Sequence, residues 1–308
     1  MIKVNNEVVE LNSFPDSTSN VKGNPCLVNG NVLISWHYEN DAEFMPLAFL
    51  TRYYQAHGNK VALYLPYVPN ARMDRVEEAE DVLAIKYFGE LINSLNFTNV
   101  FVLDVHSSAT MVAIKNCVIV DEEDMFIEVI TDIFDETDNF PIVFFPDEGA
   151  MKRYSKGMKI PFAYGMKKRD WNTGNILGLE ICGIDAEKIN GSNIIIRDDI
   201  CSYGGTFYHA AKKLKEMGAN DIYLMVTHCE HNIHNGRFGE GKENLLDTGL
   251  IKKVFTTNST YPFESSEMVK VYKTKLTFDN IEAEYDCESC GTCFDCDGCK
   301  CDCDCKED

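Results

Sequence analysis

Short apolar runs alternate along this chain with segments of helical periodicity, an order that favours a layered α/β fold. Apolar side chains recur at helical spacing over Val82–Leu95, and a second helix is expected from Thr206 to about Met217. Strands are expected at Val61–Leu65, Val100–Leu103, Ile142–Phe145, Ile194–Ile196 and Ile222–Val226. Strand–helix–strand order predicts βαβ units and mainly parallel sheets.

The chain repeats one pattern in its two halves. Leu95–His106 and Met217–His228 each run from a helix end through a polar turn and an apolar strand to a histidine. Any βαβ protein shows such echoes, but the matching length and final histidine favour two similar α/β domains. Ligands in such sheets bind beyond the carboxyl ends of strands, where both histidines are expected.

Length and composition agree with two domains and exclude several classes of protein. The 308 residues suit domains at 1–140 and 141–285, followed by an acidic Cys-rich tail at 286–308. A net charge of -20 argues against a nucleic-acid partner, which requires a basic face. No apolar run approaches the roughly 20 residues of a membrane span, and no secretory signal is expected. Five scattered cysteines without disulfide spacing are expected to be buried thiols of a reducing cytoplasm.

The segment Asn193–Thr206 carries the strongest chemical signal. A buried strand is expected to end at two adjacent carboxylates, which suit sugar hydroxyls or a metal, and a glycine-containing loop then opens a helix. Backbone N–H groups and hydroxyls at such a helix start bind phosphate. The alternative is a tight turn with a capping threonine. The residues concerned are Asp198, Asp199, Ser202, Gly204, Gly205 and Thr206.

This segment resembles the ribose-phosphate-binding loop of the ribose-phosphate diphosphokinases (phosphoribosyl pyrophosphate synthetases) and of the related phosphoribosyltransferases. Further segments, in the order found in the diphosphokinases, extend the resemblance over most of the chain up to Ser259. Each is weak alone, since a charged turn or a strand-end histidine is common. They are Phe14-Pro-Asp16, Tyr67–Arg75, Leu103-Asp-Val-His106, Phe145-Pro-Asp-Glu-Gly-Ala150, Met166-Lys-Lys-Arg169 and Thr256-Thr-Asn-Ser259.

The resemblance implies two phosphoribosyltransferase-like domains and a role for each matched residue. ATP would be bound by Phe14, Asp16, Arg72, Asp74, Arg75 and His106. The catalytic residues would be Lys167, Arg169 and His106, with Asp170–Asn175 as a lid, and Mg²⁺ would be held by His106 and Asp147. The ribose phosphate would be bound by Asp198, Asp199, Ser202, Tyr203, Gly204, Gly205 and Thr206. Because Phe14 would reach a neighbouring subunit's adenine, a dimer-based homo-oligomer, usually a hexamer, is implied.

The implied reaction transfers the β,γ-diphosphoryl group of ATP to the anomeric hydroxyl of ribose 5-phosphate, giving phosphoribosyl diphosphate and AMP for nucleotide biosynthesis. One departure leaves the acceptor open. Where the family has Asp-Thr-Gly-Gly-Thr, this chain has Ser202 and Tyr203 before the glycines. Either Tyr203 points outward, or the pocket holds more than a 5-phosphate, as in ADP-ribose for NAD salvage. A third alternative is a catalytically weak regulatory subunit.

The tail lies outside this resemblance. Its Cys-x-x-Cys and Cys-x-Cys spacings let thiolates converge on a soft metal, and eight of them would hold two Zn²⁺ ions. With almost no apolar residues it does not fold by burial, so the alternative is a disordered acidic extension. The cysteines are Cys287, Cys290, Cys293, Cys296, Cys299, Cys301, Cys303 and Cys305.

Overall fold

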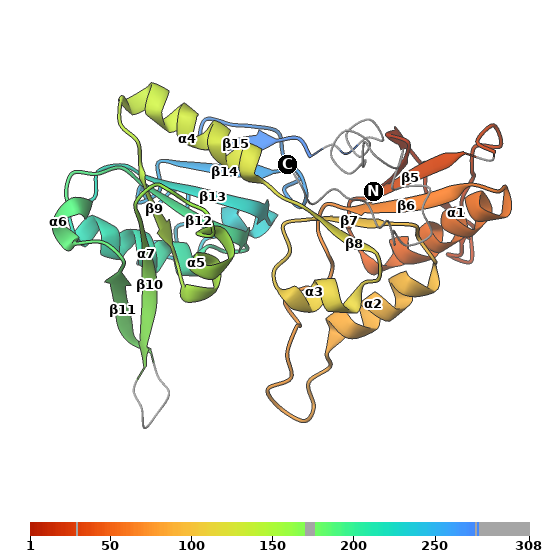
Figure 1. Cartoon of the computed structure of the whole chain (residues 1–308), viewed down its shortest axis with the longest axis horizontal. Coiled ribbons are helices and arrows are strands. Elements are labelled where there is room, and N and C mark those ends of the chain that lie inside the picture. Colours follow the sequence, from red (N-terminus) through yellow and green to blue (C-terminus); the bar gives the residue numbers. More distant parts are fainter. Residues whose placement is uncertain (29, 170–175, 275, 277–308) are drawn as a thin grey trace, which may run out of the picture. The chain divides into compact units, whose positions relative to one another are not determined.

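The computed structural model describes residues 1–28, 30–169, 176–274 and 276. These residues form two compact units (Figure 1). The first comprises Met1–Val120 and Leu276, and the second comprises Asp121–Thr274. Each unit is built on a mainly parallel sheet, so the α/β class predicted from the sequence is confirmed. The tail at 286–308 and its cysteines lie outside the described residues.

The two units divide at Val120, whereas the sequence places the boundary near residue 140. The reason is helix α4 (Glu123–Thr137), which belongs to the second unit. Its apolar side chains, such as Val129 and Ile133, share a buried cluster with Phe145 of the second sheet. When an amphipathic helix lies between two sheets in the sequence, its apolar pattern does not indicate which of the two sheets it covers.

The first unit has the strand order β2-β1-β5-β6-β7-β8. Strands β5 to β8 are parallel, and β1 and β2 join antiparallel at one edge. Helices α1 and α2 pack on one face of this sheet. The elements are β1 (Ile2–Val4), β2 (Glu7–Val8), β3 (Asn12–Ser13), β4 (Ser19–Asn20), β5 (Asn31–Trp36), η1 (Asp41–Glu43), α1 (Phe44–Ala56), β6 (Lys60–Leu65), α2 (Ala84–Ser94), β7 (Val100–Leu103), α3 (Ser108–Ala113) and β8 (Cys117–Val120).

The second unit has the strand order β11-β10-β9-β12-β13-β14-β15, in which only β10 and β11 pair antiparallel among the described strands. Helix α7 covers one face, and α4 and α5 cover the other. Besides α4, its elements are β9 (Ile142–Phe145), α5 (Glu148–Tyr154), β10 (Phe162–Arg169), β11 (Ile176–Cys182), α6 (Ala186–Ile189), β12 (Ile194–Cys201), α7 (Gly205–Glu216), β13 (Ile222–Cys229), η2 (His231–His234), β14 (Lys253–Thr257) and β15 (Val269–Tyr272).

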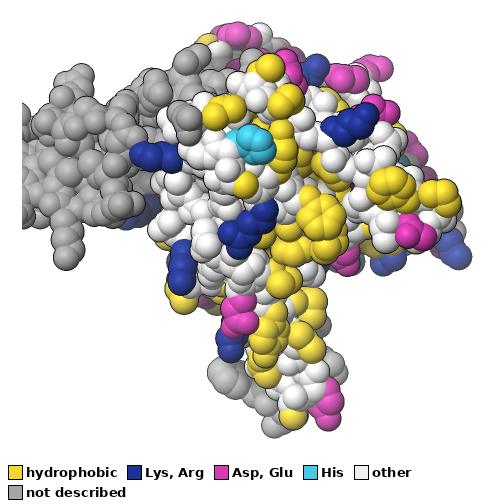
Figure 2. Space-filling model, turned by 90° about the vertical axis from the view of Figure 1, so that its right-hand side faces the viewer, with side chains coloured by type: hydrophobic (Ala, Val, Ile, Leu, Met, Phe, Trp, Pro, Cys, Tyr) yellow, Lys and Arg dark blue, Asp and Glu magenta, His cyan; other side chains and the backbone are white. Residues whose placement is uncertain are grey.

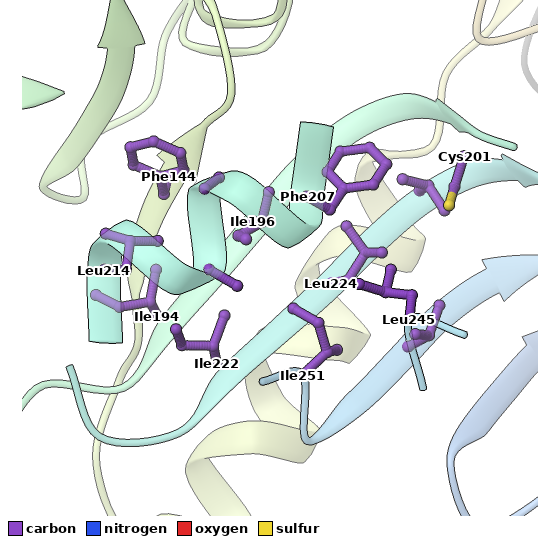
Figure 3. Packing of buried hydrophobic residues seen from close by; sticks show 14 of the residues in the cluster. Phe144, Ile194, Ile196, Cys201, Phe207, Leu214, Ile222, Leu224, Leu245 and Ile251 are labelled. Atoms are coloured by element: carbon purple, nitrogen blue, oxygen red, sulfur yellow. The ribbon is translucent and has the colours of Figure 1, made fainter. Parts of the chain in front are cut away.

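Helix α7 is fixed by an apolar stripe that faces the sheet. Phe207 and Leu214 are buried, and Figure 3 shows them among strand side chains that include Ile196 and Leu224. Burial of a large apolar side chain contributes about 1.5–3 kcal/mol relative to exposure. This packing holds the first turn of α7 at the carboxyl end of β12, where the candidate site lies.

Helices α1 and α2 carry apolar side chains at the surface. Exposed apolar side chains lie on α1, at Met45 and Phe49, and on α2, at Tyr87 and Leu91. Figure 2 shows hydrophobic side chains gathered on one face of the molecule.

Across the described residues, no helix has both the length and the apolar character needed to cross a membrane. The expectation of five buried thiols is confirmed for Cys201 and Cys229 only, because Cys26 is exposed and Cys117 and Cys182 are partly buried. All five of these cysteines are free.

Candidate active site

Strand β12 carries the two adjacent carboxylates of the candidate acceptor site. The sequence places Asp198 and Asp199 after the strand, but β12 continues through both to Cys201. The reason is pairing with β13, which runs on to Cys201 opposite Cys229 and supplies backbone hydrogen bonds where the apolar pattern has already ended. The two carboxylates therefore stand on a rigid strand and not on a loop.

The two carboxylates have different surroundings. Asp199 is buried and forms an ion pair with Arg153 of α5, 3.0 Å between Oδ1 and Nη1. Asp198 is less buried, and its Oδ1 accepts the backbone N–H of Asp199 at 2.9 Å. Burial and the neighbouring Asp199 carboxylate raise the pKa of Asp198 well above its usual value. Asp199 is thus held by a cation, whereas Asp198 carries a charge that its surroundings disfavour.

Asp147 lies at the same edge of the sheet, because β9 is the parallel neighbour of β12. It caps α5, since its Oδ1 accepts the backbone N–H of Ala150 at 3.0 Å. Its carboxylate also contributes to the raised pKa of Asp198. These two carboxylates are hard oxygen donors, which suit Mg²⁺, and a bound cation would relieve their repulsion. Within the described part of the chain, no three His, Cys, Asp or Glu side chains form a group that could hold a metal ion.

The loop between β12 and α7 has the geometry of an anion cradle. Gly204 has φ +86°, and a Cβ there would meet Leu245 Cδ2 at 2.5 Å, so both the backbone and the packing require glycine. A Cβ at Gly205 would meet nothing within 4 Å, so the space beside it is open. Helix α7 begins here, and the N–H groups of its first turn carry a favourable dipole for an anion.

The hydroxyl of Ser202 is already engaged. It donates to Glu230 Oε2 at 2.6 Å, and the side-chain amide of Asn232 donates to the same oxygen at 2.9 Å. A serine hydroxyl has one proton, so Ser202 can donate to a phosphate only after leaving Glu230. The family that the sequence resembles has an aspartate where this chain has Ser202. Through its contact with Ser202, Glu230 places a carboxylate beside this position.

Tyr203 is covered on one face by a side chain from a distant loop. The guanidinium of Arg237 stacks on its ring, with 3.3 Å between Cζ and the ring centroid. The adjacent Phe238 stacks on Tyr208 of α7, with 4.4 Å between ring centroids and 11° between planes. Tyr203 is half-buried and Arg237 exposed, so the pair lies at the surface of the loop.

In the first unit, the predicted ATP residues lie in loops. His106 follows β7 at the carboxyl end of that strand, where the sequence places it. Arg75 Nε lies 3.5 Å from Asp74 Oδ1 and its side chain is 71% exposed, which is the surface ion pair that the sequence left open as an alternative. Arg72 is exposed on the same loop. Their role toward ATP stays a prediction.

Phe14 and Asp16 occupy the turn of the β3–β4 hairpin. Phe14 is 52% exposed, so its ring is accessible to a partner. Asp16 Oδ1 accepts the backbone N–H of Thr18 at 3.0 Å and its hydroxyl at 2.7 Å, and these bonds lower the pKa of Asp16. Asp16 therefore stabilises the turn that presents Phe14.

Lys167 and Arg169 lie at the end of β10, which pairs antiparallel with β11. Their side chains, and the expected lid at 170–175, lie outside the described residues. His228 is the next-to-last residue of β13, so it lies at the carboxyl end of the strand, as expected. It is buried there, and its Nδ1 lies 2.8 Å from Ser259 Oγ, so it links β13 to the segment after β14.

Arg153, Glu230 and Arg237 escape the sequence analysis although they contact its predicted residues. Glu230 directly follows the apolar strand β13, so the rule that ligands bind at strand carboxyl ends would have found it. Arg153 lies in α5, the helix that Asp147 caps, and Arg237 lies in a loop between Gly236 and Gly239. Nothing in the spacing of either arginine indicates its partner.

Comparison with known proteins gives relatives that extend over most of the chain. No family model matches the chain. It is 25% identical over 276 residues to a ribose-phosphate pyrophosphokinase of Pyrococcus abyssi, covering 87% of this chain and 90% of the relative. A protein of the same name from Thermococcus kodakarensis is 27% identical, with 85% and 89% covered.

The fold has a solved counterpart. The crystal structure of phosphoribosylpyrophosphate synthetase from Mycobacterium smegmatis matches with a TM-score of 0.67 at 18% identity, over 86% of each chain. At this identity the likeness concerns the fold alone. The sequence relatives extend over nearly the whole described body, so both units are included. The sequence relatives and the shared fold thus support the resemblance to the ribose-phosphate pyrophosphokinase family that the motifs of the sequence indicate.

Proposed function

We propose that this protein is a ribose-phosphate diphosphokinase that transfers the β,γ-diphosphoryl group of ATP to the anomeric hydroxyl of ribose 5-phosphate, with AMP as the second product. The observation that carries the proposal is the loop between β12 and α7. It joins two carboxylates on a rigid strand to an open glycine and a helix start. Two carboxylates and an anion cradle match a sugar with a phosphate at one end.

The residues divide the work of this reaction. The N–H groups of the first turn of α7 bind the 5-phosphate, beside Gly205. Asp198 accepts hydrogen bonds from the ribose hydroxyls, while Asp199 holds Arg153 and orients the strand end. The sugar oxygen attacks the β-phosphorus, its proton is lost, and AMP leaves. Lys167 and Arg169 are proposed to neutralise charge on the transferred group, a step that depends on positioning and electrostatics.

The proposal includes Mg²⁺, ATP and self-association. Mg²⁺ would neutralise phosphate charge when bound, and Asp147 and Asp198 are the candidate oxygen ligands in the second unit. His106, Arg72, Asp74 and Arg75 are the candidates for ATP in the first. The exposed Phe14 and the exposed apolar side chains on α1 and α2 support a homo-oligomer.

The variant Lys167→Ala tests the assignment of catalysis. AMP formation from ATP, Mg²⁺ and ribose 5-phosphate should fall by about 100-fold or more, because one charge contact to the transferred group is lost. Thermal stability and oligomer size should be unchanged. Lys168→Ala is the matched control, one residue along the same strand. Wild-type turnover by Lys167→Ala would remove Lys167 from the reaction, and no turnover by the wild-type protein would favour the regulatory-subunit alternative.

A second candidate function is the same transfer to ADP-ribose. The half-buried ring of Tyr203 in the loop supports it, because an aromatic side chain there offers a surface for a group beyond the 5-phosphate. Parallel assays with ribose 5-phosphate and ADP-ribose separate the two acceptors. A higher kcat/KM for ADP-ribose would reverse the order of the two candidates.

A further inference from the structure

A short hairpin after η2, residues 236–243, is the feature from which we draw a further inference. The backbone N–H groups of Arg237 and Phe238 donate to the carbonyl of Glu243 at 2.9 Å each, and Glu243 N–H donates back to Phe238 at 2.8 Å. A Cβ on Gly236 would lie 1.8 Å from the Lys242 carbonyl oxygen, so the turn is closed too tightly for any other residue. The hairpin therefore has a defined backbone.

Two aromatic contacts fasten this hairpin to the candidate acceptor loop. Phe238 is buried and stacks on Tyr208 in the first turn of α7. The preceding residue, Arg237, stacks on Tyr203, which lies before the glycines. The hairpin backbone thus fixes where the Arg237 side chain begins, and the ring of Tyr203 fixes the position of its guanidinium. A stack of this kind at an exposed site is a weak attraction, so it orients the cation without burying it.

The charge around the loop indicates what this cation does. Asp198 and Asp199 precede the loop, and the carboxylate of Glu230 accepts from Ser202 inside it. Arg153 is paired with Asp199. A phosphate-bearing acceptor would meet these carboxylates, and Arg237 brings a positive charge onto the loop itself. A planar guanidinium binds phosphate oxygens through two parallel hydrogen bonds.

We propose that Arg237, oriented by Tyr203, binds a phosphate of the sugar acceptor and so helps to select it. This inference rests on the proposed function, because it assumes an acceptor at the loop between β12 and α7. The ligand chemistry is a phosphate attached to C5 of ribose, as a monoester in ribose 5-phosphate or a diester-linked diphosphate in ADP-ribose. Arg237 is a binding residue in this proposal and takes no part in the transfer step.

Steady-state kinetics of Arg237→Ala, Arg237→Lys and Tyr203→Ala test the proposal. Loss of a charged hydrogen-bond partner should raise the acceptor KM about 10-fold or more in Arg237→Ala. KM for ATP and the melting temperature should stay near the wild-type values, and Arg237→Lys should recover part of the loss. Lys212→Ala removes an exposed positive charge from α7 and should leave both KM values unchanged.

The two acceptors and a double variant sharpen the outcome. Equal losses with ribose 5-phosphate and ADP-ribose assign the contact to the 5-phosphate, and a loss confined to ADP-ribose assigns it to the outer phosphate. Combining Tyr203→Ala with Arg237→Ala should add little to the single change, because the ring acts through the arginine. An acceptor KM in Arg237→Ala within twofold of wild type overturns the inference while the proposed function stands.

Direct binding separates this inference from the proposed function. If the wild-type protein forms no AMP with either acceptor, the proposed function fails, and titration calorimetry with the same two compounds then tests Arg237 alone. Weaker binding to Arg237→Ala than to wild type supports the inference. Equal binding to both proteins, or no binding to wild type, overturns it.

Discussion

At the scale of single residues, the candidate acceptor site combines carboxylates and arginines at one edge of the second sheet. The sequence identifies Asp198 and Asp199 because two adjacent acids stand between an apolar run and a glycine-containing loop. It does not identify Arg153 or Glu230, because Arg153 lies in helix α5 and Glu230 follows β13, and only the fold brings these segments to the site. A local sequence pattern thus identifies the site residues that lie together in one segment, but it does not identify site residues that lie in other segments.

Asp198 is expected to lower stability in return for function. Its pKa is raised, so the folded protein holds the proton more tightly than the unfolded chain does. The ionised Asp198 carboxylate therefore destabilises the folded state. This loss of stability is absent at low pH, grows as pH rises above the ordinary carboxyl range, and is complete above the folded-state pKa. Asp198→Asn should melt higher than wild type at pH 8, by about 2–4 °C for each kcal/mol relieved, and the gap should shrink at pH 5.

Thermal melts at both pH values, with an acceptor assay, check this expectation. Asp199→Asn is the control, since it breaks an ion pair with Arg153 and should melt lower than wild type. A lower melting temperature for Asp198→Asn at pH 8 would contradict the reading of Asp198 as a disfavoured charge.

Arg197 is a buried cation whose partners differ in burial. It bonds Glu122, which is buried, and Glu123 Oε2 at 3.1 Å, whose side chain is 56% exposed. Its guanidinium also stacks on Phe126, 4.0 Å from the ring centroid. Glu122→Ala should lower the free energy of unfolding by about 3–5 kcal/mol, because it leaves a charge buried. Glu123→Ala should cost under about 1 kcal/mol. Urea denaturation measures both, and equal costs would contradict this division.

At the scale of elements, the sequence predicts five parallel strands of the two sheets, β6, β7, β9, β12 and β13, and the helices α2 and α7, but it does not predict α1 or α4. Strands β7 and β9 match their predicted ranges, and α2 and α7 begin within two residues of the expected starts. Strand β12 is longer than predicted, because pairing with β13 and not hydrophobicity determines its end. That difference matters for the site, since it places Asp198 on a strand.

The two glycines that begin α7 should respond in opposite ways. Gly204→Ala would force a side chain into φ +86° and against Leu245, so it should lower stability by about 1–2 kcal/mol or more. Gly205→Ala fits in open space at a helix start, so it should keep full stability. Its methyl group would occupy the space proposed for the phosphate, and the acceptor KM should rise about 10-fold.

Denaturation curves and acceptor kinetics on the same two variants distinguish these effects. An unchanged acceptor KM in Gly205→Ala would mean that the phosphate does not bind at the start of α7. Unchanged stability in Gly204→Ala would mean that the contact with Leu245 relaxes freely.

At the scale of the whole molecule, the repeated strand–histidine pattern correctly indicates two α/β bodies. It does not indicate that the two histidines have different surroundings: His106 lies in the segment after β7, whereas His228 is buried in the last part of β13 beside Ser259. The repeated pattern therefore indicates the fold that the two halves share, but it does not indicate the contacts that each histidine makes.

The cysteine-rich tail carries a prediction of its own. Zinc added to the full chain should protect the thiols of Cys287–Cys305 from a thiol-reactive dye, because thiolates at these spacings bind a soft metal. Magnesium is the control and should give no protection, since it prefers oxygen ligands. Dye reaction at the same rate with and without zinc would leave the tail as an acidic extension.

The proposed diphosphoryl transfer is tested most directly by identifying the products of one incubation. The purified full chain is mixed with ATP, Mg²⁺ and ribose 5-phosphate, and the nucleotide and sugar products are resolved by mass. Diphosphoryl transfer predicts AMP and a sugar 1-diphosphate in equal amounts. Formation of ADP with a singly phosphorylated sugar, or no AMP with either ribose 5-phosphate or ADP-ribose as acceptor, would contradict it.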